Sequence, residues 1–364
     1  MRATVCRQAA VAVAGLLVAA CGAASGSSPA PVATPAPPLA SPRAGLSPSP
    51  AVAKVEVVKD VVYQSVPGST DPNATKRLDI YAPTGRQGGP AVVLFHGAGY
   101  SKDGDREAAP GAPYILAEMA KALAARGAVA FVATWRSFVY DAPPLAAEAM
   151  RAQFSEDADA GACAAAYALV HAREYGADPD TLVLFGHSAG SNVAAMTGLT
   201  ERSPLPGCAV PLAPFTADGL VLWEGNWLLS EDGYDDYGAS LPTLLEAFTP
   251  WAHLATAPRV PVDLVTTRGM RRAAYRMVWS ADADGGYLAL RDPDGSLRLA
   301  ERFASIGATD DREIDGGEVD IVLGAVMREA GLDAAVIQLE HGDHGGLDED
   351  QPLVVDEILA IADR

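Results

Sequence analysis

Short runs of apolar residues, separated by longer helical stretches, dominate the chain from about residue 55 onward. Two β-branched segments in which apolar and polar residues alternate, 55–63 and 78–81, predict half-buried antiparallel strands. The continuous apolar runs that follow are typical of strands buried on both faces of a sheet. The predicted buried strands are 91–95, 129–133, 182–185, 220–222, 262–265 and 335–337, and the predicted helices are 114–126, 154–175, 191–199 and 319–330.

This order of elements predicts an α/β fold with a mostly parallel sheet of eight strands and helices on both faces. Ligands of open α/β sheets bind beyond the carboxyl ends of the strands, so the functional residues are expected in the loops that follow those ends. The folded domain is expected to span residues 55–364. Residues 268–309 form an insertion that is expected either to cover the site as a lid or substrate wall or only to extend the core.

The beginning of the chain has the form of an export signal. Arg2 and Arg7 precede an apolar run from residue 9 to 20, which is too short to span a bilayer and predicts a secretory signal peptide at 1–20. The small residues before Cys21 resemble the lipobox of bacterial lipoproteins, in which the Cys is acylated. An ordinary cleaved signal is the alternative. Residues 21–54 then predict a lipidated Cys21 and a disordered tether rich in Pro, Ala and Ser.

Composition narrows the classes of partner. Of the 364 residues, 49% are hydrophobic, which is enough for a large core, and the net charge is −19. A surface so negative repels the phosphates of nucleic acids and the headgroups of anionic lipids. No apolar run reaches the ~18–20 residues of a membrane-spanning helix. The negative charge therefore argues against a nucleic-acid partner. Together with the export signal, the absence of a longer apolar run means that the protein is expected outside the cytoplasm, held at the bacterial cell membrane only by its N-terminal lipid.

Two of the four cysteines lie in the folded domain. Cys6 and Cys21 belong to the export segment, whereas Cys163 and Cys208 stand before and after the central strand and its helix. Disulfides form in exported proteins, and the helices on either side of the central strand can be neighbours. A disulfide between Cys163 and Cys208 is therefore expected, with two separate buried thiols as the alternative.

The sequence Gly186-His187-Ser188-Ala189-Gly190 follows an apolar strand and precedes a helix. Gly-x-Ser-x-Gly in that context puts the Ser on a strained strand-to-helix turn, where larger residues at the two Gly positions would clash. The N-terminus of the following helix favours negative charge that develops beside the Ser. Ser188 is therefore the candidate nucleophile, and a Ser in an ordinary tight turn is the alternative.

At this motif the chain resembles the α/β-hydrolase superfamily. The closer likeness is to its esterase/lipase branch, which includes carboxylesterases, feruloyl- and acetyl-xylan-esterase-like domains and kynurenine-formamidase-like enzymes. The Gly-Ala-Asp-Pro sequence at 176–179 adds to the likeness, which extends over 55–364 and is weakest at 268–309. The resemblance implies a Ser-His-Asp triad, an acyl-enzyme intermediate and no cofactor. No metal is expected, because the acidic run at 230–237 lacks the ligand spacing of an EF-hand.

The segment 95–100, Phe-His-Gly-Ala-Gly-Tyr, resembles the His-Gly-Gly-Gly-Trp signature of the same branch. By that resemblance the amides of Ala98, Gly99 and Ala189 form the oxyanion hole, which needs fixed N–H donors and a close backbone approach. Trp135 and Arg136 are expected, again by resemblance, to brace this loop. A glycine-rich turn without that role is the alternative.

The base is expected after the last strand, because the triad order of the family is Ser…Asp…His. Of the six histidines only His341 and His344 satisfy this order. His344 precedes a Gly, as the family pattern requires, whereas His341 stands too close to the strand. His344 is therefore the expected base. His341 and a solvated surface His are the alternatives.

The acid of the triad follows the penultimate strand in the family, but the residues directly after 262–265 include no acid. Asp311 begins a sequence that resembles the Asp-x-x-Val-Pro form found at the family's acid. Asp311 is therefore the expected acid, which would orient the imidazole of the base. Asp310 is the first alternative and Glu224 a distant third.

Together these residues predict a serine hydrolase that cleaves a carboxylic ester of a small molecule or a carbohydrate-linked acyl group. Cleavage of an amide or peptide by the same triad, as in formamidases and prolyl-peptidase relatives, is the alternative, because the chemistry differs mainly in how the leaving group is protonated. A non-catalytic binding protein on a hydrolase scaffold is a remote third reading. The intact Ser188, oxyanion loop and His344 argue against it.

Overall fold

A computed structural model describes residues 54–66, 68, 74–85, 87–97, 112–135, 147–200, 207–211, 213–225, 257–267, 316–339 and 347–364. The predicted signal peptide at 1–20 and the insertion at 268–309 lie outside these residues, as does the predicted tether except for Lys54. Within the described part of the chain, no helix combines the length and the apolar character needed to cross a membrane.

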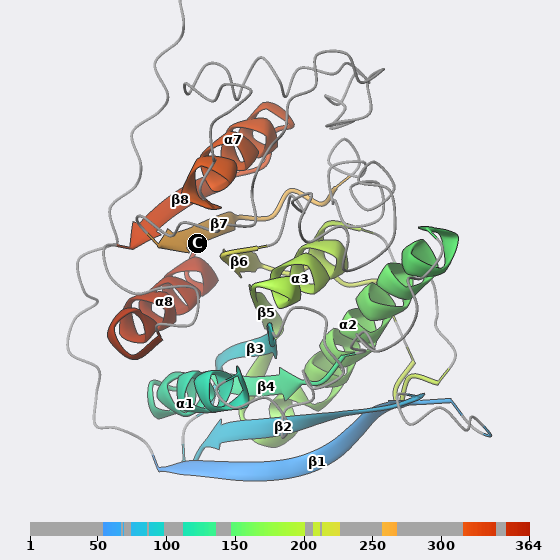
Figure 1. Cartoon of the computed structure of the whole chain (residues 1–364). Coiled ribbons are helices and arrows are strands. Elements are labelled where there is room, and N and C mark those ends of the chain that lie inside the picture. Colours follow the sequence, from blue (N-terminus) through green and yellow to red (C-terminus); the bar gives the residue numbers. More distant parts are fainter. Residues whose placement is uncertain are drawn as a thin grey trace, which may run out of the picture. The chain divides into compact units, whose positions relative to one another are not determined.

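Within the described residues one sheet of eight strands forms the core, and its strands are β1 (Val55–Ser65), β2 (Thr75–Pro83), β3 (Gly89–Phe95), β4 (Val129–Ala133), β5 (Ala177–His187), β6 (Gly219–Trp223), β7 (Val262–Thr267) and β8 (Ala334–Leu339). Their order across the sheet is β1-β2-β4-β3-β5-β6-β7-β8 (Figure 1). The strands from β3 to β8 run parallel, and β2 runs antiparallel to both β1 and β4. The predicted parallel sheet with an antiparallel edge is confirmed.

Helices cover both faces of this sheet, and those described are α1 (Ala112–Ala125), α2 (Ala147–Tyr175), α3 (Ala189–Leu199), α7 (Gly316–Glu329) and α8 (Leu347–Ala362). Side chains of α2, α3 and α7 join the apolar core on one face. Side chains of α1 and α8 join the core on the other face, and Figure 1 shows these two helices on that face of the sheet. The layered arrangement agrees with the α/β prediction.

Helix α8 is an element that the sequence analysis did not predict. Pro352 lies inside it, and a Pro within a helix costs about 3 kcal/mol because it removes a backbone donor. Val354, Ile358 and Ile361 are fully or almost fully buried against the sheet. Burial of each such side chain contributes about 1.5–3 kcal/mol, so the apolar face of α8 outweighs the cost of its Pro.

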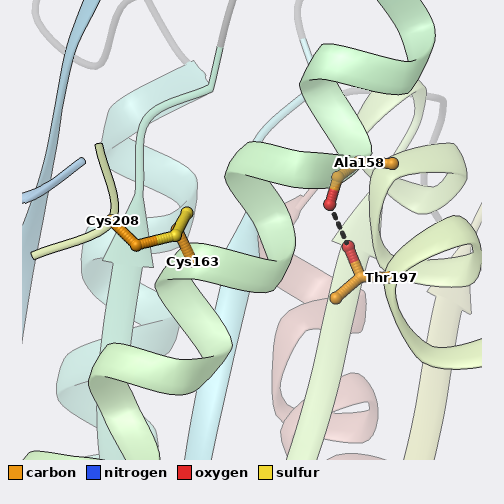
Figure 2. Close-up of a disulfide and its surroundings, with 4 residues drawn as sticks. All are labelled: Ala158, Cys163, Thr197 and Cys208. Carbon is orange, nitrogen blue, oxygen red and sulfur yellow. Dashed lines mark hydrogen bonds between the residues drawn. A yellow bond between two sulfur atoms is a disulfide. The ribbon is translucent and has the colours of Figure 1, made fainter. Parts of the chain in front are cut away.

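Helices α2 and α3 approach each other closely on their face of the sheet. A Cβ atom on Gly161 would lie 2.2 Å from Thr197 Oγ1, so a larger residue would force the Thr197 side chain to move. The Thr197 hydroxyl donates to the Ala158 carbonyl at 3.4 Å (Figure 2). Since α3 begins directly after Ser188, this packing also fixes the helix that carries the candidate nucleophile.

The expected disulfide between Cys163 and Cys208 is present, with the two Cα atoms 5.3 Å apart (Figure 2). Cys163 is buried on α2. Cys208 lies in a short segment that pairs with the edge strand β1, where the Ser65 amide donates to the Gly207 carbonyl at 2.7 Å. The disulfide therefore ties the outer edge of the sheet to helix α2.

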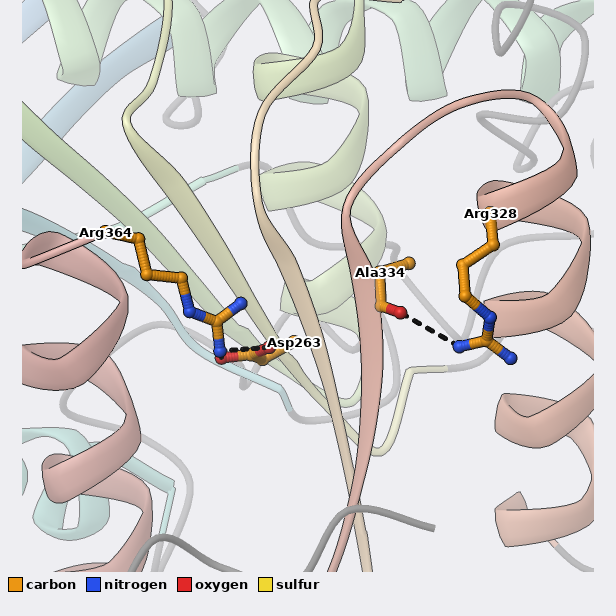
Figure 3. A network of polar contacts seen from close by, with 4 residues as sticks. All are labelled: Asp263, Arg328, Ala334 and Arg364. Carbon is orange, nitrogen blue, oxygen red and sulfur yellow. Dashed lines mark hydrogen bonds and ion pairs between the residues drawn. The ribbon is translucent and has the colours of Figure 1, made fainter. Parts of the chain in front are cut away.

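At the opposite end of the sheet an ion pair joins β7 to Arg364, which follows α8. Asp263 is fully buried on β7, and its two carboxylate oxygens accept from Arg364 at 3.0 and 2.9 Å (Figure 3). Arg328 of α7 donates to the Ala334 carbonyl at 2.9 Å, and burial lowers the pKa of its guanidinium. These contacts fasten α7 and the end of α8 to β7 and β8, the strands after which the expected acid and base follow.

Candidate active site

Ser188 occupies the sharp turn between β5 and α3. It is the single residue between the end of the strand at His187 and the start of the helix at Ala189. Its backbone has φ 53° and ψ −121°, a positive φ that residues with a side chain rarely adopt. Such strain persists only where the surroundings enforce it, and it is typical of functional turns. The strained turn that the motif predicts at this position is therefore present.

The two glycines of the motif are required by backbone contacts. A Cβ atom on Gly186 would lie 2.2 Å from the Gly190 carbonyl oxygen. A Cβ atom on Gly190 would lie 2.2 Å from the carbonyl oxygen of Phe95, the last residue of β3. Both clashes are with main chain, which has no rotamer to relieve them. The predicted reason for Gly at these positions is confirmed.

Hydrogen bonds from β6 hold the turn in place. The Ser188 amide donates to the Trp223 carbonyl at 2.9 Å. The Ser191 hydroxyl lies within hydrogen-bond distance of two carbonyls, those of Gly186 at 2.7 Å and Trp223 at 3.0 Å. The sequence analysis did not single out Ser191. Its only signal was a second Ser one turn after the candidate nucleophile, where a buried hydroxyl needs a carbonyl partner.

The end of β3 packs directly against Ser188. A Cβ atom on Gly97 would lie 3.0 Å from the Ser188 Cβ and 3.0 Å from the His187 Nδ1. The indole of Trp135, just beyond β4, donates to the His96 carbonyl at 3.0 Å and stacks on the His96 ring with centroids 5.2 Å apart. The bracing by Trp135 that the resemblance implied is therefore present at His96, whereas Arg136 lies outside the described residues.

Of the expected oxyanion donors, Ala189 is the first residue of α3, so its amide lies at the helix N-terminus beside Ser188. Ala98 and Gly99 lie outside the described residues and directly follow Gly97. A helix N-terminus carries about half a positive charge, so the neighbourhood of Ser188 favours an anion.

The expected base and acid lie outside the described residues, and this holds for His344, His341, Asp311 and Asp310. The strands that precede their segments are described. β7 ends at Thr267 and β8 at Leu339, and both run parallel to β5. Their carboxyl ends therefore share the sheet edge at which Ser188 lies.

Glu224, the third candidate acid, lies directly beyond β6. It is buried, its φ is 49°, and its amide donates to the Val265 carbonyl at 2.8 Å. Its strand is hydrogen-bonded to β5, with His187 opposite Trp223. No three His, Cys, Asp or Glu side chains gather as metal ligands among the residues that the structure describes.

A strained Ser between a central parallel strand and its helix, on an eight-stranded sheet of this order, defines an α/β-hydrolase fold. The BD-FAE family model matches residues 78–206, a span that contains both Gly97 and Ser188. A comparison of the sequence with curated proteins gives no significant match.

Solved esterases share this fold. An inhibited esterase B from Lactobacillus rhamnosis has a TM-score of 0.54 at 14% identity, covering 86% of this chain and 88% of its own. A truncated carbohydrate esterase from gut microbiota has a TM-score of 0.53 at 13% identity, covering 87% and 99%. The thermophilic esterase Est2 from Thermogutta terrifontis has a TM-score of 0.50 at 19% identity, covering 85% and 90%.

Proposed function

We propose that this protein is a serine hydrolase that cleaves carboxylic esters, with Ser188 as its nucleophile. The observation that carries the proposal is the backbone of Ser188, a non-Gly residue at φ 53° between a central strand and the N-terminus of α3. Two further observations support the proposal. Gly97 packs closely against Ser188, and the solved structures of similar fold include esterases.

In the proposed reaction the Ser188 hydroxyl attacks the ester carbonyl while His344 accepts its proton. Asp311, or Asp310 in its place, orients the imidazole. The amides of Ala98, Gly99 and Ala189 donate to the oxyanion that forms. His344 then returns the proton to the departing alcohol, which leaves an acyl group on Ser188. A water molecule, deprotonated by His344, hydrolyses this acyl-enzyme and frees the carboxylic acid.

The proposed substrates are small-molecule esters or acyl groups on a carbohydrate. Est2 of Thermogutta terrifontis is described with propionate and with butyrate bound, and another relative is described as a carbohydrate esterase. The proposed site of action is outside the cytoplasm, with Cys21 lipidated at the cell membrane. The Cys163–Cys208 disulfide is consistent with an oxidising compartment.

A fluorophosphonate probe tests the nucleophile, because it reacts with an activated Ser. We expect the wild-type protein to be labelled and Ser188→Ala to remain unlabelled. Ser191→Ala, which removes the neighbouring hydroxyl, should still be labelled. Turnover of p-nitrophenyl propionate and butyrate should fall by roughly 10⁴–10⁶-fold in Ser188→Ala.

Two outcomes would contradict the proposal. Equal labelling of the wild-type protein and the folded Ser188→Ala variant would mean that another residue reacts. A wild-type protein that neither labels nor hydrolyses any ester in a panel of acyl lengths, including acetylated and feruloylated sugars, would favour the binding-protein alternative.

A further inference from the structure

Tyr63 is a fully buried tyrosine near the carboxyl end of β1. Its hydroxyl donates to the carbonyl of Thr134, a residue 71 positions further along the chain and directly beyond β4. β2 lies between β1 and β4 in the sheet, so the side chain reaches across a whole strand to make this bond. A buried tyrosine hydroxyl needs a hydrogen-bond partner, and the partner here is the first residue after β4.

Thr134 is also held by the neighbouring strand β2. Its amide donates to the Arg77 carbonyl at 2.9 Å. Its hydroxyl also donates to this carbonyl, at 2.9 Å, and accepts from the Arg77 amide at 3.0 Å. The position of Thr134, directly beyond β4, is therefore set by hydrogen bonds to Arg77 of β2 and by the Tyr63 hydroxyl from β1.

The residue after Thr134 is Trp135, whose indole donates to the His96 carbonyl and stacks on the His96 ring. Gly97, which follows His96 beyond the end of β3, packs so closely on Ser188 that a Cβ atom added to it would lie 3.0 Å from the Ser188 Cβ. A contiguous chain of contacts thus runs from Tyr63 through Thr134 and Trp135 to the backbone that faces the nucleophile.

The Tyr63 hydroxyl remains a donor over the working pH range. Burial raises the pKa of this phenol well above its usual value, and the nearby Asp157 carboxylate on α2 raises it further. The Thr134 carbonyl therefore keeps its donor at neutral pH.

We propose that Tyr63 is a positioning residue for the oxyanion loop: through Thr134 and Trp135 it holds the His96–Gly97 segment against Ser188, so that the amides that follow can bind the oxyanion. This inference rests on the proposed function. Oxyanion donors act mainly on the transition state, so a misplaced loop lowers kcat and leaves KM nearly unchanged.

The test compares two buried tyrosines that each lose only a hydroxyl. Tyr63→Phe should lower kcat for p-nitrophenyl butyrate by about tenfold with KM unchanged, because small misplacements in a catalytic site cost large factors in rate. Tyr167→Phe is the matched control, since its hydroxyl bonds to Tyr175 on the same helix and not to the loop. It should keep the wild-type kcat.

A double-mutant cycle with Trp135→Phe tests whether Tyr63 acts through Trp135. Trp135→Phe keeps an aromatic ring against His96 but removes the indole donor, and it should show the same loss of kcat at constant KM. The double variant should lose much less than the product of the two single losses, because both act on one segment. Multiplicative losses, or a kcat for Tyr63→Phe equal to that of Tyr167→Phe, would overturn the inference. If Tyr63→Phe does not fold, an unchanged kcat in Trp135→Phe overturns it as well.

Hydrogen exchange separates this inference from the proposed function, because it does not depend on activity. In a peptide covering 92–97, amide exchange should be faster in Tyr63→Phe than in the wild-type protein or Tyr167→Phe. If the wild-type protein hydrolyses no ester, the proposed function fails and the exchange result alone decides whether Tyr63 holds the loop. Equal exchange in all three proteins would overturn the inference.

Discussion

The backbone of Ser188 stores strain at the point where reactivity is proposed. A positive φ at a residue with a side chain costs about 1–3 kcal/mol and persists only when neighbouring groups enforce it. The Ser188 amide is bonded to the Trp223 carbonyl, and Gly97 packs against its Cβ. Gly190 brings the first turn of α3 onto the last carbonyls of β3. Each of these contacts needs either a main-chain partner or the absence of a side chain.

Gly190→Ala should therefore disrupt the site. The added methyl group would lie 2.2 Å from the Phe95 carbonyl oxygen and 2.5 Å from that of His96, so the backbone has to move. We expect a loss of about 3 kcal/mol in the free energy of unfolding and a loss of most ester turnover. The measurements are denaturant unfolding and kcat with p-nitrophenyl butyrate.

Gly198→Ala on the same helix is the control. The three atoms nearest a methyl group there all belong to the Leu220 side chain, the closest at 2.4 Å, so the contact involves a side-chain end and not the main chain. Ala also favours the helix over Gly by about 1 kcal/mol. This variant should stay within about 1 kcal/mol of wild type. Equal effects of the two substitutions would show that the contact with β3 is not what requires Gly190.

A second prediction at the residue scale concerns whether Asp311 or Asp310 is the acid of the proposed triad. Asp310 and Asp311 are adjacent, and adjacent side chains point in opposite directions wherever the backbone is extended, so we expect only one of them to reach the base. Asp311→Asn should lower turnover by orders of magnitude without unfolding the protein, because His344 would lose its orienting partner. Asp310→Asn should have a modest effect. The reverse result would shift the acid to Asp310, and no effect of either would make Glu224 the next residue to replace.

At the scale of elements, β1 is one of the two edge strands of the described sheet, and an unpaired strand edge invites pairing with other chains. Residues 207–209 cover the end of this edge with backbone hydrogen bonds at Tyr63 and Ser65. The disulfide from Cys208 to α2 holds them there. The same disulfide therefore supports the strand that carries Tyr63.

Cys208→Ser should destabilise the folded domain. The disulfide closes a loop with a sequence separation of 45, and the chain-entropy relation for a loop of that size gives about 4 kcal/mol. The midpoint of denaturant unfolding should shift downward by a corresponding amount. Dithiothreitol should lower the midpoint of the wild-type protein and leave that of Cys208→Ser unchanged. A wild-type midpoint that does not respond to the reductant would mean that the disulfide does not contribute.

For the whole molecule, the expected N-terminal anchor decides where the hydrolase acts. If 1–20 is removed and Cys21 is acylated, mass spectrometry of the native protein should find a diacyl or triacyl Cys21 at its N-terminus. Cys21→Ser should release the protein from the membrane fraction without changing kcat, because the anchor is separate from the site. A wild-type protein found soluble, with its N-terminus at another residue, would contradict the lipoprotein proposal.

Local sequence was sufficient for most of the elements and for the candidate nucleophile. Apolar runs such as 91–95 and 182–185 became buried parallel strands because their hydrophobicity is continuous and the helices between them cover both faces. Ser188 could be found because Gly186 and Gly190 mark a turn that no other residues allow. Helix α8 was missed because Pro352 interrupts a pattern that only its burial against the sheet explains.

The long-range contacts between these elements were determined only by the tertiary structure. The place of β4 between β2 and β3 follows from strand pairing, which no local pattern encodes. That placement puts Thr134 within reach of Tyr63 and Trp135 against His96, partners 71 and 39 residues apart. Periodicity and turn chemistry act over a few residues and can therefore be seen in the sequence. Which distant side chains share a hydrogen bond depends on the packing of the entire sheet. The sequence around Tyr63 therefore shows only a strand residue, and its hydrogen bond to Thr134 follows from the tertiary structure alone.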